Sequence, residues 1–595
     1  MMKVSDYILK FVAGLGVTKV FYVPGGGAMH LNDSLGRSPD LEGVSMLHEQ
    51  GASIAAEAFA RVRDGYGVCL VTSGPGATNA LTGLAGAYLD SIPVIFLSGQ
   101  VKRADLAAGQ GVRQFGIQEV DILSMARSST KYAVQLTDPS RVRYELEKAA
   151  ALAVHGRPGP VWIDVPLDVQ AALVEPETLE GFDALGLPSF PVPIEKVEES
   201  IRLLNQAERP VLLLGHGIRL DGGIQEARQV YGMLEIPVLT SWNGVDLIEE
   251  DHPFYYGRPG SVGHRAANFI LQNADLVLSV GSRMSLLATG YNYESFLAGA
   301  VHVMVDIDPH EMEKKNLHPN VKIACGAKDF LATLLERKGE ICRKDRERWL
   351  DRCRFFQERY PVLGRDQEAA EGFVSTYHLV DAISRQMTET DIYQFTSSGT
   401  SVDIGMKVFR VKWGQRAFLT KGLAAMGYDI PACVGSCIAS GGRRTVCVTG
   451  DGSAAMNIQE LEVIRRRRLP VKLFVTDNQG YSMIYGSQMG NFEGRLTGCT
   501  RESGLTLPDL SKVAEAFGIR GMRIETEEDL DRQVTRVLEA DGPVVCAVRT
   551  DIRQKVLPRQ ANYMREDGQM ASRPLEDMAP LLDREELKEC MRWED

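Results

Sequence analysis

The sequence lacks the long apolar run, the paired metal-binding cysteines and the basic charge that mark several large classes of protein. Its 595 residues carry a formal net charge of −12 with a pI near 5.5, so no overall field gathers nucleic-acid phosphates. The N-terminal segment is broken by Asp6, Lys10 and Lys19 before it reaches a membrane-spanning length, and no small-residue cleavage site follows. We therefore expect no nucleic-acid partner, no membrane anchor and no signal peptide.

The ten cysteines are scattered along the chain. The closest two, Cys433 and Cys437, lie one helical turn apart in an apolar segment, and no second pair completes a zinc site. We expect reduced core cysteines in a cytoplasmic protein.

Short apolar runs alternate with helical patterns, which is typical of parallel α/β units. The pattern predicts three α/β domains, each a doubly wound parallel sheet, over residues 1–175, 190–340 and 370–550, followed by a charged tail over 551–595. A Pro- and Glu-rich linker is expected at 174–193. Predicted strands are 20–23, 44–47, 67–71 and 93–97 in the first domain, 211–214, 238–240, 276–280 and 301–306 in the second, and 446–449 and 471–476 in the third.

Two predicted strands of the third domain end in polar side chains. The run 446–449 leads into Gly-Asp-Gly around Asp451, and the run 471–476 leads to Asn478. A helix at about 457–469 makes this a right-handed crossover, so the strands are parallel and their carboxyl ends share one edge. We therefore expect Asp451 and Asn478 to lie close together.

This pair of side chains suits Mg²⁺, which keeps waters and takes further oxygens from a bound diphosphate. Glycines at 450 and 452 let backbone N–H groups approach phosphate, and the helix start behind Ser453 favours an anion. A lone Gly-Asp-Gly is more often a simple turn. The 27-residue spacing to Asn478 and the matches upstream favour a metal–diphosphate site instead.

These motifs resemble the thiamine diphosphate signature of the acetolactate synthase-like enzymes. Further matches follow in the family's order: YVPGGGAMH from Tyr22, MLHEQGASIAAEAFAR from Met46, VTSGPGATNALTGLAGAYLDSIPVIFLSGQ from Val71, GIQEVD from Gly116 and GRPGPVWIDVP from Gly156. Such a run of matches is more specific than one glycine pattern. The resemblance implies thiamine diphosphate and Mg²⁺, with the metal held by Asp451, Asn478 and the backbone carbonyl of Gly480.

The resemblance also implies which residues meet the cofactor's aminopyrimidine. Glu49 matches the carboxylic acid that hydrogen-bonds N1′, and we expect burial to favour its protonated form over the effect of the helix N-terminus. Met426 matches the apolar residue that holds the bent cofactor, the Ala424 carbonyl would meet the 4′-amino group, and Gln118 matches an active-site glutamine. The plainer alternatives are a helix-start glutamate, a core methionine and a surface glutamine.

The remaining contacts implied by the resemblance are small or hydroxyl-bearing residues. They are Gly26, Gly399, Thr400, Ser401, Gly452 and Ser453. In the family the first domain of one subunit faces the third domain of another. The resemblance thus implies a homo-oligomer, a dimer or tetramer, with its active site across the subunit interface.

The central domain aligns with segments that hold FAD in acetolactate synthases. The contacts this implies are Gly215, Gly217, Arg258, Gly281, Arg283 and Asp306. An empty structural spacer is the alternative. A bound FAD would have a structural role, because carboligation transfers no net electrons.

Two departures from the family concern the second substrate. Ser487 stands where acetolactate synthases carry a tryptophan beyond the metal loop, and Leu286 and Leu287 replace an Asp-Arg pair in the central domain. The latter change removes a bidentate partner for a carboxylate. We expect a 2-keto acid donor, pyruvate by family frequency, and a carbonyl acceptor that need not be a second 2-keto acid.

The expected activity is therefore a thiamine diphosphate-dependent carboligase. The alternatives are a C–C lyase or hydrolase with the same cofactor, a decarboxylase, oxidation of pyruvate through the flavin, and a non-catalytic regulatory paralogue. None of the ten histidines is adjacent to another, which argues against the related pyruvate decarboxylases, and Glu49, Asp451 and Asn478 argue against a decayed paralogue. The tail is expected to act either as a lid or as a brace.

Overall fold

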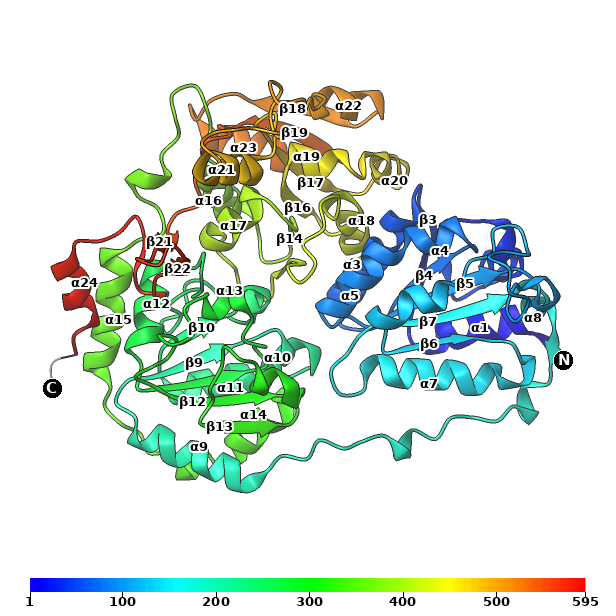
Figure 1. Ribbon diagram of the computed structural model, residues 1–595, viewed down its shortest axis with the longest axis horizontal. Coiled ribbons are helices and arrows are strands. Elements are labelled where there is room, and N and C mark those ends of the chain that lie inside the picture. Colours follow the sequence, from blue (N-terminus) through cyan, green and yellow to red (C-terminus); the bar gives the residue numbers. More distant parts are fainter. Residues whose placement is uncertain (594–595) are drawn as a thin grey trace.

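The computed structural model describes residues 1–593 and contains three α/β domains, each built on a parallel sheet (Figure 1). The first sheet has the strand order β3-β2-β4-β5-β7-β6. Its strands are β2 (Lys19–Tyr22), β3 (Glu42–Ser45), β4 (Gly67–Val71), β5 (Val94–Gln100), β6 (Tyr132–Gln135) and β7 (Val161–Pro166). The main helices of this domain are α1 (Val4–Gly14), α2 (Met29–Arg37), α3 (Glu49–Arg63), α5 (Leu81–Leu89) and α7 (Val142–Val154).

The central sheet has the order β10-β9-β11-β12-β13. Its strands are β9 (Pro210–Leu214), β10 (Val238–Thr240), β11 (Leu276–Val280), β12 (Val301–Asp306) and β13 (Val321–Ala324). Around it lie α9 (Ile194–Gln206), α11 (Ile224–Leu234), α12 (Arg265–Asn273), α14 (Ala327–Glu336) and α15 (Glu347–Arg359).

The third sheet has the order β15-β14-β16-β17-β19-β18. Its strands are β14 (Ile392–Phe395), β15 (Arg416–Phe418), β16 (Thr445–Gly450), β17 (Val471–Asp477), β18 (Arg520–Ile524) and β19 (Val544–Arg549). The longer helices are α16 (Thr376–Gln386), α17 (Thr400–Val408), α18 (Asp429–Ala439), α21 (Ser482–Asn491), α22 (Leu510–Ala516) and α23 (Leu530–Leu538).

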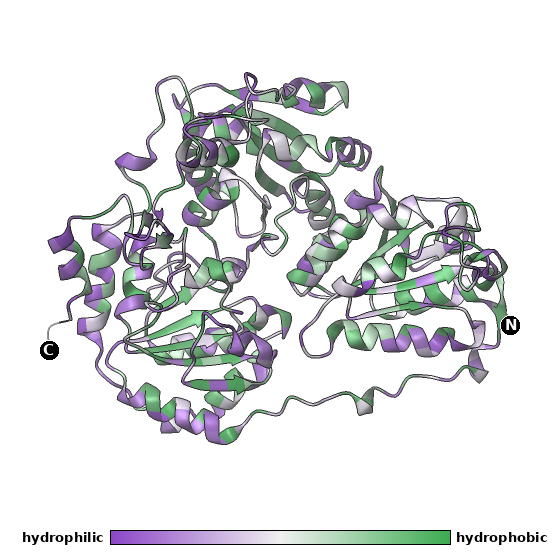
Figure 2. Cartoon of the chain, viewed as in Figure 1, coloured by the Kyte–Doolittle hydropathy of each residue, from purple (hydrophilic) through white to green (hydrophobic). Residues whose placement is uncertain are grey.

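Buried strands explain why the sequence pattern predicted this fold well. β4, β9 and β11 are buried along their whole length, as expected for parallel strands covered on both faces, and Figure 2 shows the sheets as apolar layers beneath helices of mixed hydropathy. The helix expected at 457–469 is shorter and broken, comprising a 3₁₀ turn (Ile458–Glu460) and α20 (Leu461–Arg466). Arg468 adopts a left-handed backbone ahead of Pro470, which ends the helix early.

The first and third domains of the chain pack directly on each other through α3 and α18. One core cluster contains Ala52, Ala55 and Phe59 from α3 together with Cys433 and Val434 from α18. The linker at 174–193 runs as an extended segment from the first domain to the central one (Figure 1). All ten cysteines are free thiols, and only Cys342 among them is exposed.

The tail runs from the third domain to the central one and braces it. Leu575 and Cys590 are buried in the core formed by α12 and α15, and α24 (Arg584–Met591) lies beside α15 (Figure 1). Asn268 Nδ2 donates to the Leu575 carbonyl at 3.0 Å. Within residues 1–593 we find no helix long and apolar enough to cross a membrane.

Glu460 joins the third domain to the start of α3. Its carboxylate accepts hydrogen bonds from the backbone N–H groups of Leu47 and His48, with the shortest at 3.0 Å. The residue has no exposed surface, and burial raises the pKa of its carboxyl to about 7, although the two N–H groups oppose this shift.

This raised pKa predicts a pH-dependent contribution to stability. The folded chain binds the Glu460 proton more tightly than the unfolded chain, so the stabilisation is complete below about pH 4.5 and is lost as the pH rises through 7. Between pH 6 and 8 the wild type should lose roughly 1–2 kcal/mol of unfolding free energy that Glu460→Gln does not lose. Urea unfolding at both pH values measures the difference. Glu462→Gln, a neighbouring carboxylate held by Arg465, is the control, and an equal pH dependence in wild type and Glu460→Gln would contradict the prediction.

Candidate active site

Asp451 and Asn478 lie at the tips of the neighbouring strands β16 and β17. The strands are parallel, with Gly450 paired to Thr476. One carboxylate oxygen of Asp451 accepts from the N–H groups of Asn478 and Gln479 at 3.1 and 2.7 Å, and the other accepts from Gly452 N–H at 2.8 Å. The structure thus brings the two residues together as the crossover predicted.

The oxygens at this edge form a hard-ligand set. Burial raises the pKa of Asp451 to about 7, while its three N–H partners act in the opposite direction. The Asn478 side-chain oxygen accepts from Gly480 N–H at 3.1 Å, and a Cβ at Gly480 would lie 2.4 Å from the Cys499 carbonyl oxygen, so only glycine fits there. Among the described residues no group of three or more His, Cys, Asp or Glu side chains could hold a metal ion. One carboxylate, one amide and one carbonyl fit Mg²⁺ completed by diphosphate and water better than zinc.

The segment around Met426 lies against the same edge. Ala424 and Gly427 have left-handed backbones, the Ser397 hydroxyl donates to the Ala425 carbonyl, and Gly427 N–H donates to Ser453 Oγ at 3.0 Å. The Met426 side chain is only partly buried. Part of the side chain is therefore open, as the predicted contact with a ligand requires.

Asp429 is a central residue of the site that the sequence did not identify. Its fully buried carboxylate accepts from the hydroxyls of Thr396, Thr449 and Ser453 at 2.5, 2.6 and 2.5 Å. These hydroxyls belong to the ends of β14, β16 and the Asp451 turn. The position of Asp429 just after Met426 was visible in the sequence, but its three partners are distant along the chain.

Glu49 is the first residue of α3, and the His48 side chain caps this helix by accepting from Gln50 N–H. One Glu49 oxygen accepts from Asn79 Nδ2 at 2.9 Å, which fixes the carboxylate against α4 (Pro75–Asn79). The other oxygen would lie 3.3 Å from a Cβ at Gly76. The Glu49 side chain is half-buried in this single chain, a less closed environment than expected. Asn79 was not identified from the sequence.

Gln118 and Gly26 lie close to the segment 72–76, which also approaches Glu49. Gln118 has a left-handed backbone, and its carbonyl oxygen is 2.5 Å from the position of a Cβ at Gly74, directly before α4. Gly26 begins a 3₁₀ turn held at the end of β4 by the bond from Gly27 N–H to Thr72 Oγ1, at 3.0 Å.

The residues at the start of α17 lie against the sheet edge that carries Asp451 and Asn478. Gly399 caps α17, Thr400 Oγ1 lies 3.0 Å from Ser482 Oγ, and Ser401 Oγ lies 2.9 Å from Thr476 Oγ1. Gly399, Thr400 and Ser401 therefore meet the end of β17 and the residue that starts α21.

Within one chain, a hydrogen-bonded bridge connects the start of α3, next to Glu49, to the segment around Met426. Asn457 Nδ2 donates to the Gly427 carbonyl at 2.7 Å and to Gln50 Oε1 at 3.5 Å. A short bridge of two side chains thus connects the residue after Glu49 to the residue after Met426.

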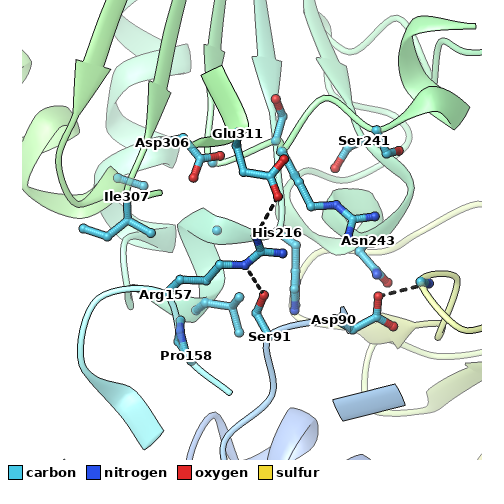
Figure 3. Close-up of a pocket in the computed structure, with 18 of the residues that line it drawn as sticks. Asp90, Ser91, Arg157, Pro158, His216, Ser241, Asn243, Asp306, Ile307 and Glu311 are labelled. Atoms are coloured by element: carbon cyan, nitrogen blue, oxygen red, sulfur yellow. Dashed lines mark hydrogen bonds and ion pairs between the residues drawn. The ribbon is translucent and has the colours of Figure 1, made fainter. Parts of the chain in front are cut away.

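A cavity of about 440 Å³ lies at the carboxyl ends of β9, β11 and β12, where all three domains contribute walls (Figure 3). The central domain contributes Gly217, Gly281, Arg283 and Asp306, and the third domain contributes Lys421 and Gly422. Asp306 is the last residue of β12, and burial raises the pKa of its carboxyl to about 6. Figure 3 shows the first domain entering through Asp90, Ser91 and Arg157.

Two of the residues implied for FAD do not line this cavity. A Cβ at Gly215 would lie 2.1 Å from Ser282 Cα, so Gly215 packs the loops behind the wall. The Arg258 guanidinium is buried against the third domain, where it donates to the Phe409 carbonyl at 2.9 Å and pairs with Glu250 at 3.3 Å.

The cavity wall offers unused polar groups. In the described chain, both ring nitrogens of His216 and the Ser282 hydroxyl are buried without a hydrogen-bond partner, and both residues line the cavity. Buried polar atoms without partners are costly. These groups, with Asp306 and Arg283, fit a ligand that carries both ribose and phosphate.

Comparison with known proteins agrees with this geometry. Three family descriptions match: the N-terminal TPP binding domain of thiamine pyrophosphate enzymes over residues 2–125, their central domain over 197–334 and their C-terminal TPP binding domain over 397–548.

Curated relatives match along nearly their whole length. The acetolactate synthase isozyme 2 large subunit of Escherichia coli K12 is 30% identical over 94% of this chain and 97% of its own. A probable acetolactate synthase large subunit of Methanocaldococcus jannaschii is 31% identical over 92% of each chain, and the chloroplastic acetolactate synthase 2 of Zea mays is 33% identical over 93% and 86%. The chain belongs to the acetolactate synthase-like family of thiamine pyrophosphate enzymes.

Proposed function

We propose that this protein is a thiamine diphosphate-dependent carboligase that uses a 2-keto acid, most simply pyruvate, as donor. In the net reaction the C1–C2 bond of pyruvate breaks and CO₂ leaves. A new bond joins C2 to the carbonyl carbon of the acceptor, and one proton is taken up by the acceptor oxygen. The observation that carries the proposal is the pairing of Asp451 with Asn478 at two strand tips beside the Met426 segment.

The residues at this edge have separate roles in the proposal. Asp451, Asn478 and the Gly480 carbonyl would hold Mg²⁺, while Gly399, Thr400, Ser401, Gly452 and Ser453 bind the diphosphate. Thiamine diphosphate, when bound, would supply a carbon nucleophile for the keto carbon of the donor and would accept the electron pair left when CO₂ departs. Glu49 holds the proton that it shares with the cofactor's ring nitrogen, and Asn79 orients the carboxyl group through its 2.9 Å hydrogen bond. Gln118 and the Ala424 carbonyl line the space around the reacting carbon.

The acceptor in this proposal is a carbonyl compound other than a second 2-keto acid. Leu286 is 39% exposed at the central cavity, Leu287 lies beside it, and neither can pair with a carboxylate as an arginine does. α21, which follows the metal loop, has no buried residue and exposes Met483 and Ile484. Leucines in place of a cation favour an acceptor without a carboxylate, such as an aldehyde, a ketone or a keto-sugar.

We also propose that the central cavity holds FAD. Gly217, Gly281, Arg283, Asp306 and the unpartnered His216 and Ser282 support this assignment, whereas Gly215 and Arg258 act behind the wall. The role would be structural, because the net reaction requires no oxidant.

The ten free cysteines support a reducing compartment such as the cytoplasm.

The functional unit we propose is a homo-oligomer whose active site spans two subunits. Exposed apolar side chains support an interface: Leu47, two residues before Glu49, is 45% exposed, and Phe115 and Ile117, in the segment of Gln118, are 58% and 90% exposed. In that oligomer the α3–α18 packing seen in the single chain would form between two subunits instead of within one.

Replacing Glu49 by Gln should separate binding from turnover. Gln keeps the shape but cannot hold the proton, so we expect unchanged thiamine diphosphate affinity and a loss of turnover of at least roughly 100-fold. The assay is consumption of pyruvate with Mg²⁺, thiamine diphosphate and a panel of acceptors, followed by mass spectrometry of the products. Glu42→Gln, outside the site and paired with Lys19, is the control.

Near-normal turnover of Glu49→Gln would contradict the proton-holding role. Acetolactate as the main product from pyruvate alone would contradict the proposed acceptor. A colourless protein that takes up no added FAD would contradict the flavin assignment.

Co-expression of two inactive variants should test the shared site. In a mixed dimer of Glu49→Gln and Asp451→Asn, a site across the interface leaves one intact pair of residues, so random pairing restores about one quarter of wild-type activity. A site within each chain leaves every site defective. Activity no higher than that of either variant alone would therefore show that the site is formed within one chain.

A further inference from the structure

We propose that Asp90 is a positioning residue of the thiamine diphosphate site, an inference that rests on the function proposed above. Asp90 follows α5 in the first domain and touches neither the metal edge nor Glu49. Its contacts instead fix the segment 421–428, which contains Ala424 and Met426, against α3.

The first contact joins Asp90 to the start of that segment. Gly422 N–H donates to one Asp90 oxygen at 3.1 Å, and the other oxygen accepts from Arg61 Nη2 at 2.8 Å. A Cβ at Gly422 would lie 2.7 Å from the Asp90 oxygen, so no larger residue allows this approach. Arg61 lies on α3, twelve residues after Glu49.

A second carboxylate fixes the other end of the segment. The Tyr428 hydroxyl donates to Glu57 at 2.6 Å, and Glu57 in turn accepts from Arg61 Nε at 2.6 Å. The Arg61 guanidinium thus lies between two carboxylates, one bonded to Gly422 and one to Tyr428. All three charged side chains are almost completely buried.

This arrangement clamps both ends of the segment to the helix that begins with Glu49. The clamp therefore fixes the position of the segment that carries Ala424 and Met426, the residues proposed to meet the cofactor. A buried charge that loses its partner is costly, so the clamp favours one geometry. Asp90, labelled in Figure 3, and Gly422 also line the central cavity, so their contact forms part of its wall.

The alternative role for Asp90 is simple adhesion between domains. Adhesion would affect the stability of the protein without affecting cofactor affinity specifically. Asp246 provides a matched control, because it is a buried carboxylate at the same junction that accepts from Arg416 and from Ala417 N–H at 3.0 Å. It holds β15 and does not contact the segment 421–428.

The experiment is calorimetric titration of thiamine diphosphate into the full-length protein with Mg²⁺, for four variants. We expect Asp90→Asn to weaken binding about tenfold, the effect of one charge-assisted hydrogen bond. Gly422→Ala, which keeps every charge, should weaken binding similarly, and the double variant should be no weaker than either single one. Asp246→Asn should lower the melting temperature but change the affinity less than twofold.

Unchanged affinity in Asp90→Asn, additive effects in the double variant, or an equal loss in Asp246→Asn would each overturn the inference. A wild type that binds thiamine diphosphate yet shows one of these results overturns this inference alone. A wild type that binds none overturns the proposed function together with it.

Discussion

The active site depends on one carboxylate that accepts three backbone hydrogen bonds. Asp451 collects the N–H groups of Gly452, Asn478 and Gln479, and so binds the ends of β16 and β17 into one rigid edge. Asp429, close to this edge, accepts hydrogen bonds from three hydroxyl groups and so joins the ends of β14 and β16 to the Asp451 turn. Both carboxylates are buried, and within residues 1–593 neither pairs with a side-chain cation, an arrangement that suits the approach of a metal ion and its diphosphate.

The parallel crossover made this edge predictable from the sequence. Each strand is a short apolar run, and the residues that follow two successive runs must meet at one side of the sheet. Asp306, the last residue of β12, was indicated by the family resemblance alone. The crossover pattern could not identify Asp429, Asn79 or Asp90, because their partners come from elements far apart in sequence and their own local patterns are ordinary.

The sequence pattern also did not predict short elements that are only partly buried. β6 is intermediate in burial at every position, so its pattern carries no alternation that would mark a strand. Arg258 was placed beside the FAD site by resemblance alone, whereas its guanidinium is held by carbonyls of the third domain. A side chain as long as arginine can reach either side of its own backbone, and only the packing of the neighbouring domain decides which.

The extended linker at 174–193 has a consequence for assembly. About twenty residues span at most roughly 70 Å when stretched, so the first domain stays tethered within a small volume around its own third domain. Exchange of that domain with a neighbouring chain replaces each buried surface by an identical one. If the proposed oligomer forms by such exchange, dilution would favour chains whose first domain packs on their own third domain. The contacts of each pair would stay the same, and the length of the linker would set the concentration at which the two forms are equally populated.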